Sequence, residues 1–182
     1  SADYTLTASI TMLAGVELAG EGVFGRQADG GALFVYGTTL LSGAASLVMV
    51  DVPNTSYGVA IRDLSIDGNA DQATVGIQTA AGDTHVIHCG IVDCQVGVEV
   101  LGHATLFDVA VKIQDSIIQG CSVRGIRTGS GGGTPSDGMI ANCRILQCGA
   151  AAGYSVEFAN GGWQMIGCHI TNGSAAARDV LV

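Results

Sequence analysis

Hydrophobic and polar residues alternate in short runs along most of the chain, and one pattern of alternation returns. Five segments align without gaps: VAIRDLSIDGN (59–69), THVIHCGIVDC (84–94), VKIQDSIIQGC (111–121), GMIANCRILQC (138–148) and WQMIGCHITNG (163–173). Their starts lie 25, 27, 27 and 25 residues apart. Alternation with a period of two is typical of β-strands, whose successive side chains point to opposite faces. We therefore predict short strands that repeat at a nearly fixed interval.

Three columns of apolar or small residues run through these segments, and the third column is isoleucine every time. Their members are Ile61, Val86, Ile113, Ile140 and Met165; Leu64, Cys89, Ser116, Cys143 and Cys168; and Ile66, Ile91, Ile118, Ile145 and Ile170. A further short alternation follows each segment, at Ile77/Thr79, Val98/Val100, Ile126/Thr128, Val156/Phe158 and Val180/Val182. Each repeat is therefore expected to hold three short strands.

Repeats made only of short strands bury their inward faces by stacking on one another. We predict an all-β fold, a right-handed single-stranded parallel β-helix with three short strands per coil of 25–27 residues. Equivalent residues of neighbouring coils then stack at about 4.8 Å. The same strands could also form a β-sandwich, but the fixed interval and the gapless columns favour the β-helix.

The expected domain organisation is one β-helix over residues 1–182, with irregular N-terminal coils over 1–52 and regular coils over 59–182. The irregular coils are placed at ITMLAGVELAGEG (10–22), ALFVYG (32–37) and SLVMVDV (46–52). The sequence ends in mid-coil at RDVLV (178–182), and solenoids need caps that block end-to-end association. We therefore expect a homo-oligomer, a further capping domain or a short C-terminal cap. The domain could also be a fragment of a longer chain.

Composition supports a packed domain and narrows the set of partners. Hydrophobic residues make up 48% of the chain and charged residues only 13%, which argues against disorder. No apolar run reaches the roughly 18 residues of a membrane helix. The net charge of −9 argues against nucleic acid, whose phosphates need clustered cations. We expect neither a membrane nor nucleic acid as a partner.

The chain resembles the pectate-lyase-like superfamily of right-handed β-helix proteins. ITMLAGVELAGEG (10–22) is similar to the strand, glycine corner and G-x-G turn that open many members, and VAIRDLSIDGNADQ (59–72) to their first regular coil. The superfamily includes secreted polysaccharide lyases, epimerases, hydrolases and phage tailspike domains. The resemblance thus implies a polysaccharide partner and an extracellular or virion-surface location. It does not select one activity, because unrelated functions share this fold.

The preferred candidate site is an outward column on the last strand of each repeat, formed by Gln78, Glu99, Arg127, Glu157 and Leu181. Glu99, Arg127 and Glu157 are the candidate catalytic residues, and Gln78 is a candidate binding residue. The resemblance implies an arginine base beside acidic calcium ligands, so a lyase would take Ca²⁺; otherwise we expect no cofactor. The aspartate cluster of the superfamily is not recognisable. An arginine between two glutamates is also typical of a structural ion-pair ladder.

A corner column provides the second candidate site, with Asp63, His88, Asp115, Asn142 and Gly167 in equivalent positions. An imidazole between two carboxylates could transfer protons, so Asp63, His88 and Asp115 are candidate binding residues. The alternative is structural, because Asp and Asn favour corners, where their side chains bond to the local backbone.

The cysteines belong to the repeat rather than to a metal motif. They form an inward column and a corner column, namely Cys89, Cys143 and Cys168, and Cys94, Cys121 and Cys148. Cysteine is a small apolar residue that is often buried, and the spacing is not that of a zinc ribbon. We predict buried free thiols and no metal site; disulfides between stacked thiols are the alternative.

Three further features bear on binding. TGSGGGTPSDG (128–138) is a glycine-rich insertion that we expect to border a groove. The outward apolar residues Val92, Leu146 and Ile117 predict contact with another chain or domain. Trp163, the only tryptophan, is expected to face inward.

Two classes of function follow. The first is a carbohydrate-interacting or structural module of the tailspike or cell-surface type, and the second is a polysaccharide lyase or epimerase acting on a lateral face. We prefer the module, because no complete catalytic constellation is recognisable.

Overall fold

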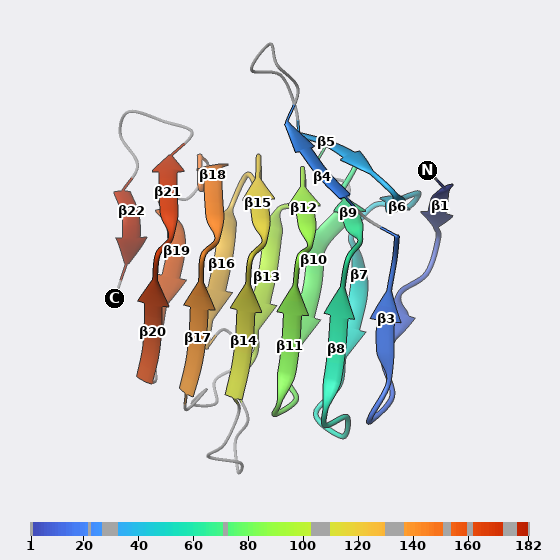
Figure 1. The fold of residues 1–182 in the computed structure, drawn as a ribbon, viewed down its shortest axis with the longest axis horizontal. Helices are drawn as coiled ribbons and strands as arrows, with labels where there is room; N and C mark the ends of the chain where they lie inside the picture. The colour runs from blue at the N-terminus through green and yellow to red at the C-terminus, as the bar shows by residue number, and fades with distance from the viewer. Residues whose placement is uncertain are drawn as a thin grey trace.

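The computed structural model describes residues 2–21, 23–26, 33–70, 73–102, 110–129, 137–150, 154–159, 162–172 and 178–181. These residues form an all-β parallel solenoid with three strands per coil, which confirms the predicted fold class (Figure 1). The described part of the chain holds no helix of the length and hydrophobicity needed to cross a membrane.

Three parallel sheets form the walls of the solenoid. Sheet A contains, in spatial order, β1 (Ala2–Leu6), β6 (Thr38–Ser42), β9 (Ser65–Asp67), β12 (Gly90–Val92), β15 (Ile117–Gln119), β18 (Arg144–Cys148) and β21 (His169–Asn172). Sheet B contains β2 (Ile10–Thr11), β7 (Leu47–Val52), β10 (Ala73–Thr79), β13 (Val96–Val100), β16 (Arg124–Thr128), β19 (Tyr154–Phe158) and β22 (Arg178–Leu181). Sheet C contains β3 (Glu17–Ala19), β8 (Val59–Arg62), β11 (Thr84–Ile87), β14 (Ala110–Gln114), β17 (Asp137–Ala141) and β20 (Gly162–Ile166).

Each regular coil passes from sheet C to sheet A and then to sheet B. In Figure 1 the chain rises along sheets C and A at the front and descends along sheet B at the back, while it advances from right to left. This winding is right-handed, as predicted.

A hairpin interrupts the winding near the N-terminus. β4 (Val23–Arg26) and β5 (Leu33–Tyr36) pair antiparallel with each other and join none of the three sheets. The sequence predicts an irregular coil at ALFVYG (32–37), whereas the strand within it, β5, pairs with β4.

The predicted apolar columns are in register, and they form the core. One column lies on sheet C and consists of Ile61, Val86, Ile113, Ile140 and Met165. Another lies on sheet A and consists of Ile66, Ile91, Ile118, Ile145 and Ile170. All are fully buried except Met165 and Ile170 in the C-terminal coil, which are partly buried. Full burial of one such side chain stabilises the fold by about 1.5–3 kcal/mol, so these columns dominate the packing.

Glycines on sheet B leave the space that the corner cysteines and the isoleucine column fill. A Cβ atom built on Gly97 would lie 2.6 Å from Ile118 Cγ2 and 3.2 Å from Cys121 Sγ. The same approach recurs one coil earlier at Gly76 and one coil later at Gly125. The core therefore needs glycine at this position in three successive coils.

The expectation for Trp163 is also confirmed, because its side chain packs against the core. The indole stacks on the Phe158 ring with a centroid distance of 5.7 Å. Its in-register neighbour is Gly138, where a Cβ atom would lie 2.2 Å from the indole. Glycine at 138 therefore makes room for the tryptophan.

The apolar residues Val92, Leu146 and Ile117 lie half-buried on the strands of sheet A, with Val92 and Leu146 in one column as expected. Contact with another chain or domain at this face stays a prediction.

Candidate functional site

The outer side of sheet B carries the preferred row of candidate residues. Gln78 pairs in register with Glu99, Glu99 with Arg127, and Arg127 with Glu157, on the neighbouring strands β10, β13, β16 and β19. Leu181 on β22 continues the row. The sequence therefore placed this row correctly. We call Gln78, Glu99, Arg127 and Glu157 the sheet B row.

Glu99 is the more deeply buried of the two carboxylates in the row. Gln78 Nε2 donates a hydrogen bond of 2.7 Å to Glu99 Oε2. Arg127 Nη1 lies 3.6 Å from Glu99 Oε1, which is an ion pair but too long for a good hydrogen bond. The Glu99 side chain is only 10% exposed, whereas that of Arg127 is 39% exposed. The arginine therefore presents its donors to solvent beside a fixed carboxylate.

Glu157 is held by Arg124, a residue that the sequence did not single out. Arg124 Nε donates to Glu157 Oε2 at 2.8 Å, and Arg124 Nη1 donates to the Val123 carbonyl at 2.8 Å. The guanidinium carbon also lies 5.3 Å from the centre of the Tyr154 ring, within the range of a cation–π contact. The expected ladder is therefore built from two ion pairs, Arg127 with Glu99 and Arg124 with Glu157.

One more acidic residue continues the row toward the N-terminus. Asp51 on β7 pairs in register with Gln78. Burial raises the pKa of the Asp51 carboxyl above its ordinary value of 3.8. Together with the sheet B row, the face offers hydrogen-bond donors and acceptors in successive coils, about 4.8 Å apart.

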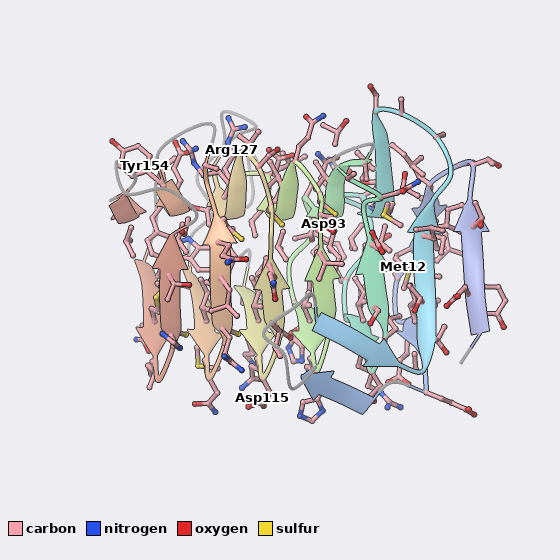
Figure 2. All side chains as sticks on the ribbon, turned by 90° about the horizontal axis from the view of Figure 1, so that it is seen from above. Met12, Asp93, Asp115, Arg127 and Tyr154 are labelled. Carbon is pink, nitrogen blue, oxygen red and sulfur yellow. The ribbon has the colours of Figure 1, made fainter. Side chains whose placement is uncertain are left out.

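The corner column lies on the opposite side of the solenoid. Figure 2 shows Asp115 at one edge of the molecule and Arg127 and Tyr154 at the other. The structure thus separates the candidate binding residues Asp63, His88 and Asp115 from Gln78, which belongs to the sheet B row.

Backbone geometry explains the residue types of the corner column. Asp63, His88, Asp115 and Asn142 have φ values of 56°, 51°, 50° and 54°, and Gly167 has 64°. This left-handed region is costly for most residues, and Asp, Asn and His are the side-chain-bearing residues enriched there. The corner conformation alone therefore accounts for a histidine at position 88.

The side chains of the corner column nevertheless contact one another. His88 Nδ1 lies 3.4 Å from Asp63 Oδ1, and His88 Nε2 lies 3.9 Å from Asp115 Oδ2. Asn142 Nδ2 donates to Asp115 Oδ1 at 3.2 Å, and Arg62 bonds to Asp63. The imidazole is 54% exposed and its contacts are long, so they constrain it only weakly. A role in binding or proton transfer stays a prediction.

The cysteines are free thiols, as predicted, and five of the six are buried. Burial raises the pKa of Cys89 and of Cys143 to about 12. The pKa of Cys121 is also raised. The larger cause is a hydrogen bond with the Cys148 thiol, and the second is burial. Within the described ranges, no three His, Cys, Asp or Glu side chains are placed to hold a metal ion.

The glycine-rich insertion at 128–138 is described only at its two ends. Residues 130–136 lie outside the described part of the chain, so the groove expected beside them stays a prediction.

Comparisons with known proteins add no relative. No family model matches the chain, and no curated protein and no solved structure shows significant similarity to it. The chain is a parallel β-solenoid, and its place in the pectate-lyase-like superfamily stays a prediction.

Proposed function

We propose that the protein is a carbohydrate-binding β-helix module that takes a polysaccharide along the outer side of sheet B. The observation that carries this proposal is the sheet B row, in which Gln78 and Arg127 flank the buried, hydrogen-bonded Glu99 on adjacent strands. A ligand with hydroxyl groups at regular intervals suits such a row, because each coil repeats the spacing of its neighbour. An extracellular or virion-surface location goes with this proposal.

Preorganisation supports the sheet B row as a binding surface. Binding is weakened by the entropy lost when side chains become ordered, at about 0.5–1.5 kcal/mol for each long side chain. Glu99 and Glu157 already have partners that fix their carboxylates, at 2.7 Å and 2.8 Å. Arg127 keeps exposed N–H groups that could donate hydrogen bonds to a hydroxyl or a carboxylate of the ligand.

A polysaccharide screen tests the proposal. The chain is titrated with neutral and acidic polysaccharides, and binding is followed by calorimetry. Glu99→Gln should weaken the binding of any ligand found, because it removes the negative charge that fixes Arg127. Asp67→Asn on sheet A is the matched control and should bind as the unmodified chain does. Equal affinities for both variants would contradict the placement of the site.

An enzyme of the lyase or epimerase class is the second candidate. Arg127 favours it, because its side chain is exposed beside the carboxylate of Glu99. Its neutral guanidine form would be the base that takes a proton from a bound uronate and becomes the guanidinium. Glu99 and Glu157 are then the other catalytic candidates, and Ca²⁺ would be a cofactor of a lyase.

Product analysis separates the two candidates. A lyase forms an unsaturated product that absorbs in the ultraviolet, and Arg127→Ala should abolish that signal while the protein stays folded. Polysaccharide binding without any such product, and without change in the sugar composition, would favour the module.

A further inference from the structure

A recess lies on sheet C, away from the sheet B row. It is a shallow cleft of about 360 Å³ over the beginnings of β14, β17 and β20. Ala110, Asp137 and Gly162 are in register in one line, so the two small residues leave space on both sides of the aspartate. The cleft therefore follows from small side chains in two of three adjacent coils.

The second line of the cleft supplies a cation, an apolar side chain and an amide. Lys112, Met139 and Gln164 are in register on the same three strands, and all three line the cleft. The side chains of Lys112, Asp137 and Gln164 have no hydrogen-bond or ion-pair partner among the described residues. They are therefore available to an external ligand.

The chemistry of this lining suits a sugar ring. An aspartate accepts hydrogen bonds from hydroxyl groups, a lysine donates them, and a glutamine does both. Met139 offers a flexible apolar surface to the C–H groups of the ring. A volume of about 360 Å³ lies at the lower end of the range of small-molecule sites, which is enough for one or two sugar units.

Charge selects a neutral sugar over an acidic one. Lys112 and Asp137 carry opposite charges, so the cleft has no excess of positive charge to attract an anion. The chain as a whole carries a net charge of −9, which repels polyanions. We propose that this cleft is a binding subsite for a neutral pyranose unit, independent of the site on sheet B.

Methyl NMR of the methionines tests the subsite directly. The chain has four methionines, and only Met139 lines the cleft, whereas Met12 and Met49 are buried elsewhere. With ¹³C-methyl methionine, addition of cellotriose, maltotriose or mannotriose should shift the Met139 signal in a saturable way. The Met12 and Met49 signals should not move. Met139→Leu assigns the signal.

Variants separate the cleft from the other faces. Ala110→Leu fills the cleft and should abolish the shift, and Gln164→Ala should weaken binding by about three- to tenfold through loss of a hydrogen bond. Gln119→Ala on sheet A is the matched control and should leave the affinity unchanged. The Met139 signal reports on this cleft alone, so that failure of the sheet B proposal does not affect this test.

Two results would overturn the proposal. The first is a Met139 signal that none of the three neutral trisaccharides moves. The second is tighter binding of trigalacturonate than of any neutral trisaccharide at this methyl, because it would show that the cleft selects an anion.

Discussion

At the scale of single residues, the interior of the solenoid is fitted around glycines. Gly97 faces Ile118 and Cys121, and the Gly125 carbonyl oxygen would lie 2.6 Å from a Cβ atom at position 97. Ser155 takes the corresponding place one coil after Gly125, where its hydroxyl donates to the Cys148 carbonyl at 3.1 Å. The need for glycine is therefore a property of the middle coils.

Gly97→Ala tests this fit. The added methyl group must displace an isoleucine side chain or the backbone of the next coil, so we expect a loss of about 1–3 kcal/mol in the free energy of unfolding. Urea denaturation measures it. Thr74→Ala, on the half-buried side of β10, is the control and should change stability by less than about 0.5 kcal/mol. Equal stability of the two variants would mean that the coils are less closely packed than described.

His88 allows a second test, because its backbone has φ 51°. We expect His88→Asn to keep the stability of the fold, and His88→Val to lose about 1–2 kcal/mol, since a β-branched residue is poorly suited to the left-handed region. His85→Val, on the strand just before the corner, should cost little, because valine favours strands. If His88→Val is as stable as His88→Asn, the left-handed backbone conformation does not determine which residue suits position 88.

At the scale of strands and columns, the spacing of residues in the sequence predicts which residues share a column and a face of the solenoid. The isoleucine column follows from the gapless alignment of the five segments, and the sheet B row follows from the short alternation after each segment. The structure pairs the members of both in register. A column places a residue on a face, but it does not determine which partner a long side chain contacts.

The contacts of Arg124 show this limit. Arg124 is in register with Val96, in a different column from Glu157, yet its side chain reaches across to Glu157 and lies over Tyr154. An alignment of repeats shows which residues share a column, and it does not show contacts between residues of different columns. The cleft on sheet C was missed for a similar reason, since a hollow depends on side-chain sizes in three adjacent coils.

The loss of stability on truncating an isoleucine of the column should depend on how deeply that residue is buried. Ile118→Ala should reduce the free energy of unfolding by about 2–5 kcal/mol, because Ile118 is fully buried between coils. Ile170→Ala removes the same atoms from a partly buried position in the last regular coil, so we expect less than half of that loss. Chemical denaturation of both variants measures the difference. A larger loss for Ile170→Ala would contradict the described core.

At the scale of the whole molecule, three continuous sheets enclose one core, which separates the interior chemistry from the outer faces. The thiols lie within this core, whereas the sheet B row and the cleft on sheet C lie on separate outer faces. Binding at either face therefore needs no opening of the solenoid.

Thiol titration tests whether the interior is closed. Burial raises the pKa of Cys89 and Cys143, so few thiolates form at neutral pH, and the five buried cysteines should resist a thiol reagent in the folded protein. The half-buried Cys168 should react first. Unfolding without reductant should then expose six reactive thiols; fewer would indicate a disulfide.

The most direct test of the proposed function compares two arginines on different faces. Arg127 belongs to the sheet B row, whereas Arg144 lies on sheet A. For a polysaccharide that binds the unmodified chain, we expect Arg127→Gln to lower the affinity at least about tenfold, as loss of a charged hydrogen bond does. Arg144→Gln should leave the affinity unchanged. Equal affinity of the two variants, or no polysaccharide binding at all, would contradict a carbohydrate site on sheet B.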